Sequence, residues 1–121
     1  MKDSRPKTII CDIDGTLIVH TNPCGIARNK ANVTLLEGTE EKLREWDRKG
    51  YNIILLTGRK ESLRKVTEEQ LARVGIFYDQ LVMGVGGGKR YLINDRKPNG
   101  TEDYAIAINI ERDKGIKNIN I

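Results

Sequence analysis

The stretch at residues 8–19, TIICDIDGTLIV, places two aspartates where an apolar strand ends. Its first four residues are β-branched or apolar, which is typical of a strand buried on both faces of a parallel sheet. Side chains alternate along a strand, so the carboxylates of Asp12 and Asp14 project to the same side of the chain. Gly15 permits a sharp turn and Thr16 adds a hydroxyl. Two like charges so close together are costly unless a cation or a reaction needs them, so this turn is a candidate site.

Outward from this stretch, helical and strand patterns alternate. Residues 51–56 form a second apolar strand pattern, which ends at Thr57. Before it, Thr39 can cap an amphipathic helix that ends at Gly50, and after it a second amphipathic helix spans 63–74. This alternation predicts an α/β fold, a Rossmann-like parallel sheet with right-handed crossovers and helices on both faces.

The remaining elements have weaker patterns. FYDQLVMG (77–84) and KRYLINDRKP (89–98) are predicted as two short strands. Residues 104–110 alternate apolar and smaller side chains with period two, which also predicts a strand. Residues 19–37 lack clear periodicity and are predicted to form a loop or small flap.

Composition sets limits on the class of protein. With 121 residues and 13.7 kDa, we expect one domain, residues 1–121. No apolar run approaches the roughly 20 residues that a transmembrane helix needs, and no signal peptide is recognisable, so we expect no membrane partner and a cytoplasmic location. Cys11 and Cys24 are expected to be free thiols. The net charge of +4 is spread along the chain.

Ligands of parallel α/β sheets bind beyond the carboxyl ends of the strands, and three such ends carry polar residues here. These are Asp12 and Asp14, then Thr57, and then Asp95. A carboxylate can take a phosphoryl group as a nucleophile, while a second carboxyl group moves protons and a hydroxyl holds phosphate oxygens. Mg²⁺, with its preference for oxygen ligands, would neutralise the approaching anion.

These residues resemble the haloacid dehalogenase-like (HAD) hydrolase superfamily, whose phosphatases carry a D-x-D-G-T signature on the first strand. The resemblance implies that Asp12 is the nucleophile and a metal ligand. It implies that Asp14 is the general acid/base and that its backbone carbonyl contacts the metal. Thr57, in ILLTGR, lies 45 residues after Asp12 and matches the second motif. The implied activity is a Mg²⁺-dependent phosphatase that works through an aspartyl phosphate.

The resemblance also implies the remaining site residues. Lys89 is the natural cation for the phosphate, with its neighbour Arg90 as a rival. Asp95 is the expected third metal ligand, and Asn99 stands where a second acid often falls. Four further residues are expected to bind substrate: Gly15, Thr16, Gly58 and Arg59.

Alternatives from other classes fit less well. A phospho-accepting receiver domain would place an aspartate where Thr57 ends the second strand, and an inactive binding module would not need so complete a set of catalytic residues. For the substrate, we expect a phosphorylated small molecule such as a sugar phosphate, rather than nucleic acid. A phosphatase of polynucleotide ends is the alternative. Members of the superfamily usually carry a cap domain between these motifs, and the intervals after Asp14 and between Thr57 and Asp95 have no room for one, so the resemblance implies a member with no cap domain. We therefore expect the flap at 19–37 and a second subunit of a homo-oligomer to close the site.

Overall fold

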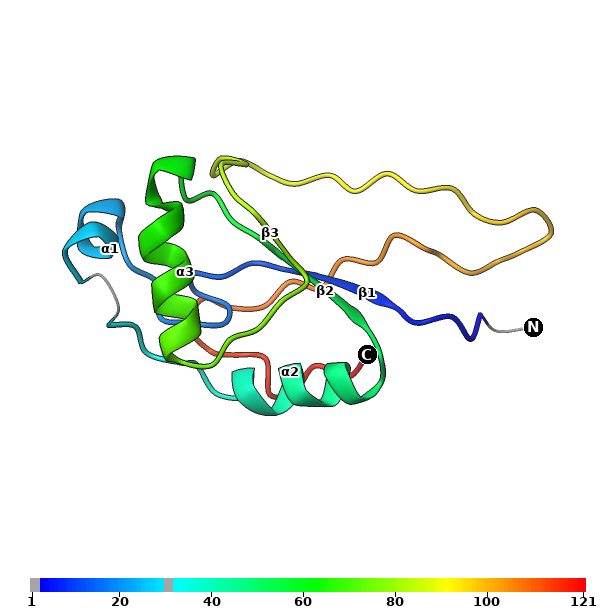
Figure 1. Ribbon diagram of the computed structural model, residues 1–121. Helices are drawn as coiled ribbons and strands as arrows, with labels where there is room; N and C mark the ends of the chain where they lie inside the picture. The colour runs from blue at the N-terminus through cyan, green and yellow to red at the C-terminus, as the bar shows by residue number, and fades with distance from the viewer. Residues whose placement is uncertain (1–2, 30–31) are drawn as a thin grey trace.

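The computed structural model describes residues 3–29 and 32–121, and it contains a parallel three-stranded sheet in the order β1-β2-β3 (Figure 1). The strands register Thr8 with Asn52, and Leu56 with Val82. The elements in chain order are β1 (Thr8–Cys11), α1 (Pro23–Asn29), α2 (Thr39–Arg48), β2 (Asn52–Leu56), the 3₁₀ turn η1 (Glu61–Leu63), α3 (Arg64–Arg73) and β3 (Gln80–Val82). This arrangement confirms the predicted α/β class.

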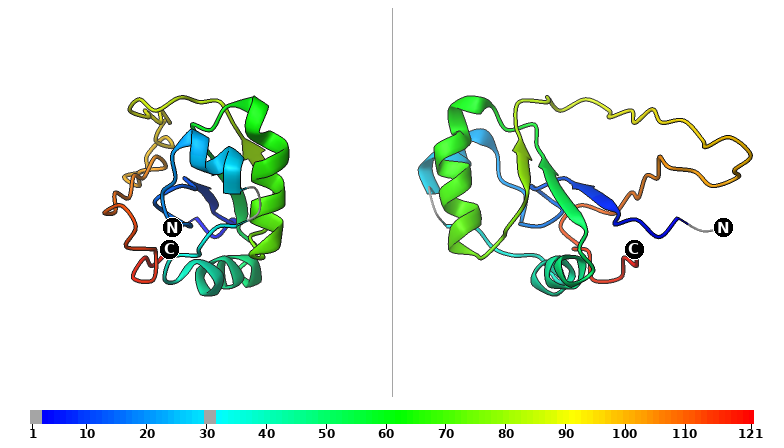
Figure 2. Two further views of the ribbon diagram at one scale, coloured as in Figure 1. Left: turned by 90° about the vertical axis from the view of Figure 1, so that its left-hand side faces the viewer. Right: turned by 45° about the vertical axis from the view of Figure 1, so that its right-hand side comes forward.

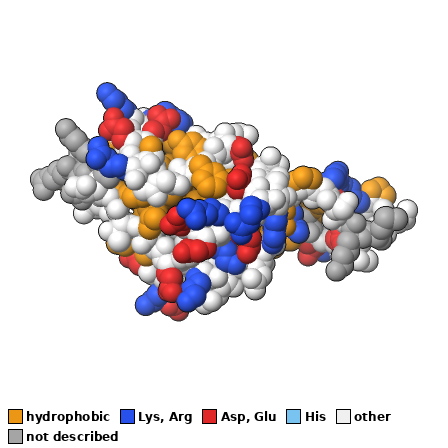
Figure 3. Space-filling model, turned by 60° about the horizontal axis from the view of Figure 1, so that its bottom comes forward, with side chains coloured by type: hydrophobic (Ala, Val, Ile, Leu, Met, Phe, Trp, Pro, Cys, Tyr) orange, Lys and Arg blue, Asp and Glu red, His pale blue; other side chains and the backbone are white. Residues whose placement is uncertain are grey.

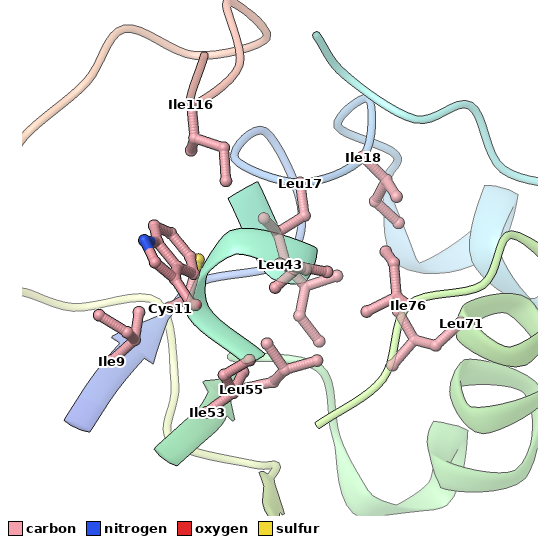
Figure 4. Close-up of a cluster of buried hydrophobic side chains, with 12 residues drawn as sticks. Ile9, Cys11, Leu17, Ile18, Leu43, Ile53, Leu55, Leu71, Ile76 and Ile116 are labelled. Atoms are coloured by element: carbon pink, nitrogen blue, oxygen red, sulfur yellow. The ribbon is translucent and has the colours of Figure 1, made fainter. Parts of the chain in front are cut away.

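The core lies on the face of the sheet that the alternation of β1 and β2 directs toward the helices (Figure 4). Cys11 and Leu55 are register partners on this face, and both are buried. Trp46 and Leu43 of α2 and Leu71 of α3 complete the same cluster. Cys11 and Trp46 are therefore both part of the core.

Helices α2 and α3 pack on the same face of the sheet, and the order of the strands explains why. The two crossovers, β1 to β2 and β2 to β3, step in the same direction across the sheet, and right-handed connections of that kind put their helices on the same side. On the other side Ile10 remains 49% exposed. The helical cover expected on both faces is thus seen on the face of Cys11 and Leu55, and β1 forms an open edge.

The start of α2 differs in detail from the prediction. Gly38, with a φ of 89°, is the N-cap residue and makes no side-chain cap bond. Thr39 instead donates its hydroxyl to the carbonyl of Leu17, at 2.8 Å, and is buried. The threonine therefore fastens α2 to the segment after β1, while Gly50, with a φ of 73°, follows the helix as expected.

The flap predicted at 19–37 is built into the fold over its described residues. It contains α1, whose Ile26 is only 3% exposed, and the amide of Leu36 donates to the carbonyl of Leu17. Val33 and Leu35 pack against the core. Val33 and Leu35 remain partly exposed, and together with Ile26 they cover the segment that follows β1. Residues 30 and 31 lie outside the described part.

The predicted and observed structures differ most in the chain after β3. Neither 89–98 nor 104–110 forms a strand in the part that the structure describes. Figures 1 and 2 show this stretch, yellow to orange, extending away from the helices and turning back. Ile93 is 92% exposed and Ile106 is 71% exposed, so the period-two pattern is present without a neighbouring strand to bury it. The stretch borders an open depression of about 1100 Å³ beside β1.

The final residues return to the core. Ile116 is buried against α2 and β1 residues, and its amide donates to the carbonyl of Glu37. The amide of Asp113 donates to the carbonyl of Gly15, and the carboxylate of Asp113 accepts from the amide of His20. The C-terminal segment thereby holds the turn that carries the two aspartates. Over the described residues, every helix falls short of the length and apolar character that crossing a bilayer requires.

Candidate active site

The turn after β1 is held by its own backbone. The amide of Gly15 donates to the carbonyl of Ile18 at 2.7 Å, and the amide of Thr16 donates to the carbonyl of Ile13 at 3.2 Å. Gly15 has a φ of 82°, which favours glycine. These two amides, expected to bind substrate, are therefore occupied within the turn. The hydroxyl of Thr16 contacts Asp12 Oδ2 at 3.4 Å.

Asp12 presents its carboxylate at the end of β1, and its side chain is 37% exposed. The guanidinium of Arg90 approaches Asp12 Oδ1 at 3.5 Å. Lys89 makes no ion pair within the described chain. Of the two rival cations, the structure therefore brings Arg90 to the site.

Asp14 is less exposed, at 15% of its side chain, and is paired with Arg59. Its Oδ2 accepts from Arg59 Nε at 2.8 Å, and its Oδ1 accepts from Arg59 Nη2 at 2.7 Å. Arg59 is 6% exposed, and its Nη1 donates to Thr67 Oγ1 and Gln70 Oε1 of α3. Arg59 was expected to bind substrate, but its guanidinium is directed to Asp14 and to α3.

Thr57 and Gly58 lie at the end of β2, next to the end of β1. Thr57 is 1% exposed, and its Oγ1 accepts from the amide of Arg59 at 3.1 Å, which leaves the hydroxyl proton free to donate. A Cβ at Gly58 would lie 2.7 Å from the carbonyl oxygen of Gly86. Glycine at 58 thus lets the loop after β3 approach the end of β2.

Asp95 is not brought to Asp12 and Asp14. It lies in the exposed stretch after β3, where its carboxylate accepts a hydrogen bond from the side-chain amide of Asn94. Asn94 lines the depression beside Thr8 and Ile10, at the other end of β1. Among residues 3–29 and 32–121, no three His, Cys, Asp or Glu side chains gather closely enough to form a metal cluster. The predicted three-acid arrangement is therefore absent from this structure.

The donors that remain still suit Mg²⁺. This ion keeps several waters and often takes one or two protein carboxylates together with substrate phosphate oxygens. The open Asp12 carboxylate and the backbone carbonyl of Asp14 are hard oxygen donors on one turn. They could hold such an ion with waters in the other positions.

Cys11, directly before Asp12, is not a competing nucleophile. Burial, and to a smaller extent the negative charge of Asp12, raise the pKa of the Cys11 thiol to about 12. The thiol therefore stays protonated near neutral pH and points into the core.

Two polar residues of the site were not predicted. Thr67 and Gln70 lie on the buried face of α3, where they accept the bonds of Arg59. They interrupt an apolar stripe that includes Leu63, Leu71 and Val74. A buried polar side chain needs a hydrogen-bonding partner. Polar residues within an apolar stripe are therefore the feature of the sequence from which a buried partner such as Arg59 could have been predicted.

The DIDGT turn at a strand end, the threonine at the next strand end and the parallel sheet together define a HAD-type phosphatase. A family model described as "Polynucleotide kinase PNKP phosphatase domain" matches residues 6–94. The chain belongs to this family.

Two similar solved structures are those of a Pnkp1/Rnl/Hen1 RNA repair complex and of a Pnkp1/Rnl/Hen1 complex. One chain is 36% identical over 68% of this chain, with a TM-score of 0.57, and the other is 33% identical over 74%, with a TM-score of 0.58. This chain spans only 27% and 32% of their lengths. A structural-genomics target from Vibrio cholerae, 23% identical over 73% of this chain and 79% of its own, has a TM-score of 0.52 and supports the fold. The comparison with curated proteins gave no match.

Proposed function

We propose that this domain removes a terminal phosphate from a polynucleotide through an aspartyl phosphate on Asp12. The observation that carries the proposal is the open Asp12 carboxylate beside Arg90, on a turn without a covering domain in the described chain. A carboxylate in this position can reach a phosphate at the end of a long chain. The family match and the similar Pnkp1 chains support this substrate class.

In the first step, an Asp12 oxygen attacks phosphorus and the bond from phosphorus to the leaving oxygen breaks. Asp14 gives that oxygen a proton, so the nucleic acid departs as an alcohol. In this proposal Arg90, which lies beside Asp12, and the hydroxyl of Thr57 stabilise the charge on the phosphoryl oxygens.

In the second step, water attacks phosphorus and the bond between phosphorus and Asp12 breaks. Asp14 takes a proton from the water, which returns both carboxyl groups to their starting states and releases inorganic phosphate. When bound by Asp12 and the Asp14 carbonyl, Mg²⁺ would supply positive charge that neutralises the phosphate.

The choice of substrate revises the earlier expectation. A sugar phosphate was favoured and nucleic acid was not expected, but the relatives with the higher identities belong to a complex described as acting in RNA repair. The chain has a net charge of +4, and Figure 3 shows acidic and basic side chains interspersed over one face. The described residues on the face in Figure 3 form no continuous basic track of the kind that a long duplex binds.

The test compares substrates on the same enzyme. Oligonucleotides with a 3′ or a 5′ phosphate and a panel of sugar phosphates are incubated with the protein and Mg²⁺, and released phosphate is measured. We expect the highest kcat/KM on an oligonucleotide end. Higher kcat/KM on a sugar phosphate would contradict the proposed substrate and leave the phosphatase activity standing.

A further inference from the structure

Arg59 is the most thoroughly bonded side chain near the site. Its three nitrogens make four hydrogen bonds to side chains of other elements, at 2.7 to 3.0 Å. Two of these go to Asp14, and the other two go to Thr67 and Gln70 on α3. The Arg59 side chain is 2% exposed and that of Asp14 is 15% exposed, so water competes little for these bonds.

The two hydrogen bonds from Arg59 fix the orientation of the Asp14 carboxylate. Two parallel bonds from a planar guanidinium define both the position of a carboxylate and the rotation of its plane. Each carboxylate oxygen has a second lone-pair direction, so the group held by Arg59 can still exchange a proton with a leaving oxygen or a water. Arg59 thus constrains Asp14 without using all of its acceptor capacity.

Arg59 is itself held in place. Gln70 accepts from Nη1 at 2.7 Å, and its own amide donates to the carbonyl of Ile26 in α1 at 3.3 Å. Gln70 is 1% exposed and Ile26 is 3% exposed. The chain of contacts therefore runs from Asp14 through Arg59 and Gln70 to α1.

A contribution to folding stability does not by itself explain why Arg59 and Asp14 form a buried ion pair. Burying an ion pair costs desolvation free energy that the attraction between the charges often fails to exceed, and apolar residues of similar size can stabilise as well. Thr67 and Gln70 occupy positions where α3 could present apolar side chains to the core. The arrangement is better explained by what it does to Asp14.

We propose that Arg59, fixed by Thr67 and Gln70, is a positioning residue that aims the carboxyl group of Asp14 at the leaving oxygen. This inference rests on the proposed phosphatase function. It assigns Arg59 to the acid/base group rather than to the substrate, and it makes two residues of α3 part of the catalytic apparatus.

The test uses two phosphate esters that differ in their need for an acid. Glycerol phosphate has a poor leaving group that needs a proton, whereas p-nitrophenyl phosphate has a good one that does not. The variants are Arg59→Lys, Thr67→Val and Gln70→Met. For Arg59→Lys we expect kcat/KM to fall on the order of a hundredfold on glycerol phosphate and only a few-fold on p-nitrophenyl phosphate. For Thr67→Val and Gln70→Met we expect kcat/KM on glycerol phosphate to fall about tenfold, with a smaller loss on p-nitrophenyl phosphate.

Glu69→Met, at an exposed neighbouring position on α3, is the matched control and should leave both rates unchanged. Each substitution is repeated with Asp14→Asn, where we expect no further loss because the group to be positioned is gone. Thermal melting checks that the variants are folded. The two α3 variants keep the test available where Arg59→Lys does not fold.

Equal losses on both esters, or losses that add to that of Asp14→Asn, would overturn the inference while the phosphatase activity stands. A wild-type protein that is inactive on both esters and on oligonucleotide ends would overturn the proposed function and this inference with it.

Discussion

Arg90 Nη1 lies 3.5 Å from Asp12 Oδ1, and both side chains are more than a third exposed. The contact joins a residue of the stretch after β3 to the end of β1, 78 positions earlier in the chain. The guanidinium lies next to the carboxylate that we propose as the nucleophile. A phosphate dianion arriving at Asp12 would find this cation already in place.

The first prediction is that Arg90→Ala reduces kcat/KM for phosphate release much more than Lys89→Ala does. Loss of one preorganised charge donor typically costs on the order of a hundredfold or more. Arg90→Lys should recover part of the loss, because a point charge remains without the planar fork. Steady-state kinetics on one oligonucleotide substrate decides this, and a larger effect of Lys89→Ala would return the role to the residue that the sequence favoured.

Asp12→Asn should leave the fold intact and abolish turnover, since an amide cannot attack phosphorus. The carboxylate is partly exposed and its pairing with Arg90 is of the surface kind, worth about 0–1 kcal/mol, so the melting temperature should hardly change. Acid quenching during turnover should trap a phosphorylated wild-type protein, visible by mass spectrometry, and none in the variant. Retained turnover by the variant would rule out Asp12 as nucleophile.

Metal dependence tests the place of Asp95. Chelation should abolish activity and Mg²⁺ should restore it. Asp95, the third ligand that the sequence predicts, lies in the exposed stretch away from Asp12. If it binds the metal in solution, its removal should weaken metal binding. Asp95→Ala should then raise the Mg²⁺ concentration for half-maximal activity, while Asp103→Ala in the same stretch should not. An unchanged titration would leave the metal with Asp12, the Asp14 carbonyl and water.

The two cysteines should differ sharply in reactivity. Cys11 is buried, with its pKa raised to about 12, whereas Cys24 is exposed. Because the thiolate is the reactive form, iodoacetamide near neutral pH should modify Cys24 in the folded protein and Cys11 only after unfolding. Mass spectrometry should find one adduct under native conditions and two in denaturant. Rapid native modification of Cys11 would show that the end of β1 opens more readily than its packing indicates.

The first two strands and the two longer helices were predictable because their patterns are local. Residues 8–11 and 51–56 are apolar runs of strand length, and glycines follow α2 and α3 where a helix end requires a positive φ. The residues after β3 were not predictable in the same way. Alternation at 104–110 shows that a strand is compatible with the sequence, but a strand forms only where another strand offers hydrogen bonds.

In the candidate site, too, some residues were predictable from local sequence and others depended on the tertiary structure. The DIDGT turn and Thr57 were found from their place at strand ends, whereas the partner of Asp14 depends on the tertiary path of Arg59. A guanidinium after a strand looks the same in the sequence whether it faces substrate or the interior. The choice between Lys89 and Arg90 likewise depended on how the long stretch passes Asp12. The cytoplasmic location and the homo-oligomer stay predictions.

Strand β1 is an edge strand of the sheet, and its carboxyl end carries Asp12, so a strand added at this edge would lie next to the candidate site. A strand that paired there in parallel would cover the half-exposed Ile10 and would finish beside Asp12. Whatever sequence supplied that strand would thus contribute the next side chains at the reaction centre. Changing the strand at this edge, by fusion or by a supplied peptide, would therefore change which side chains lie beside Asp12 without substituting the aspartates.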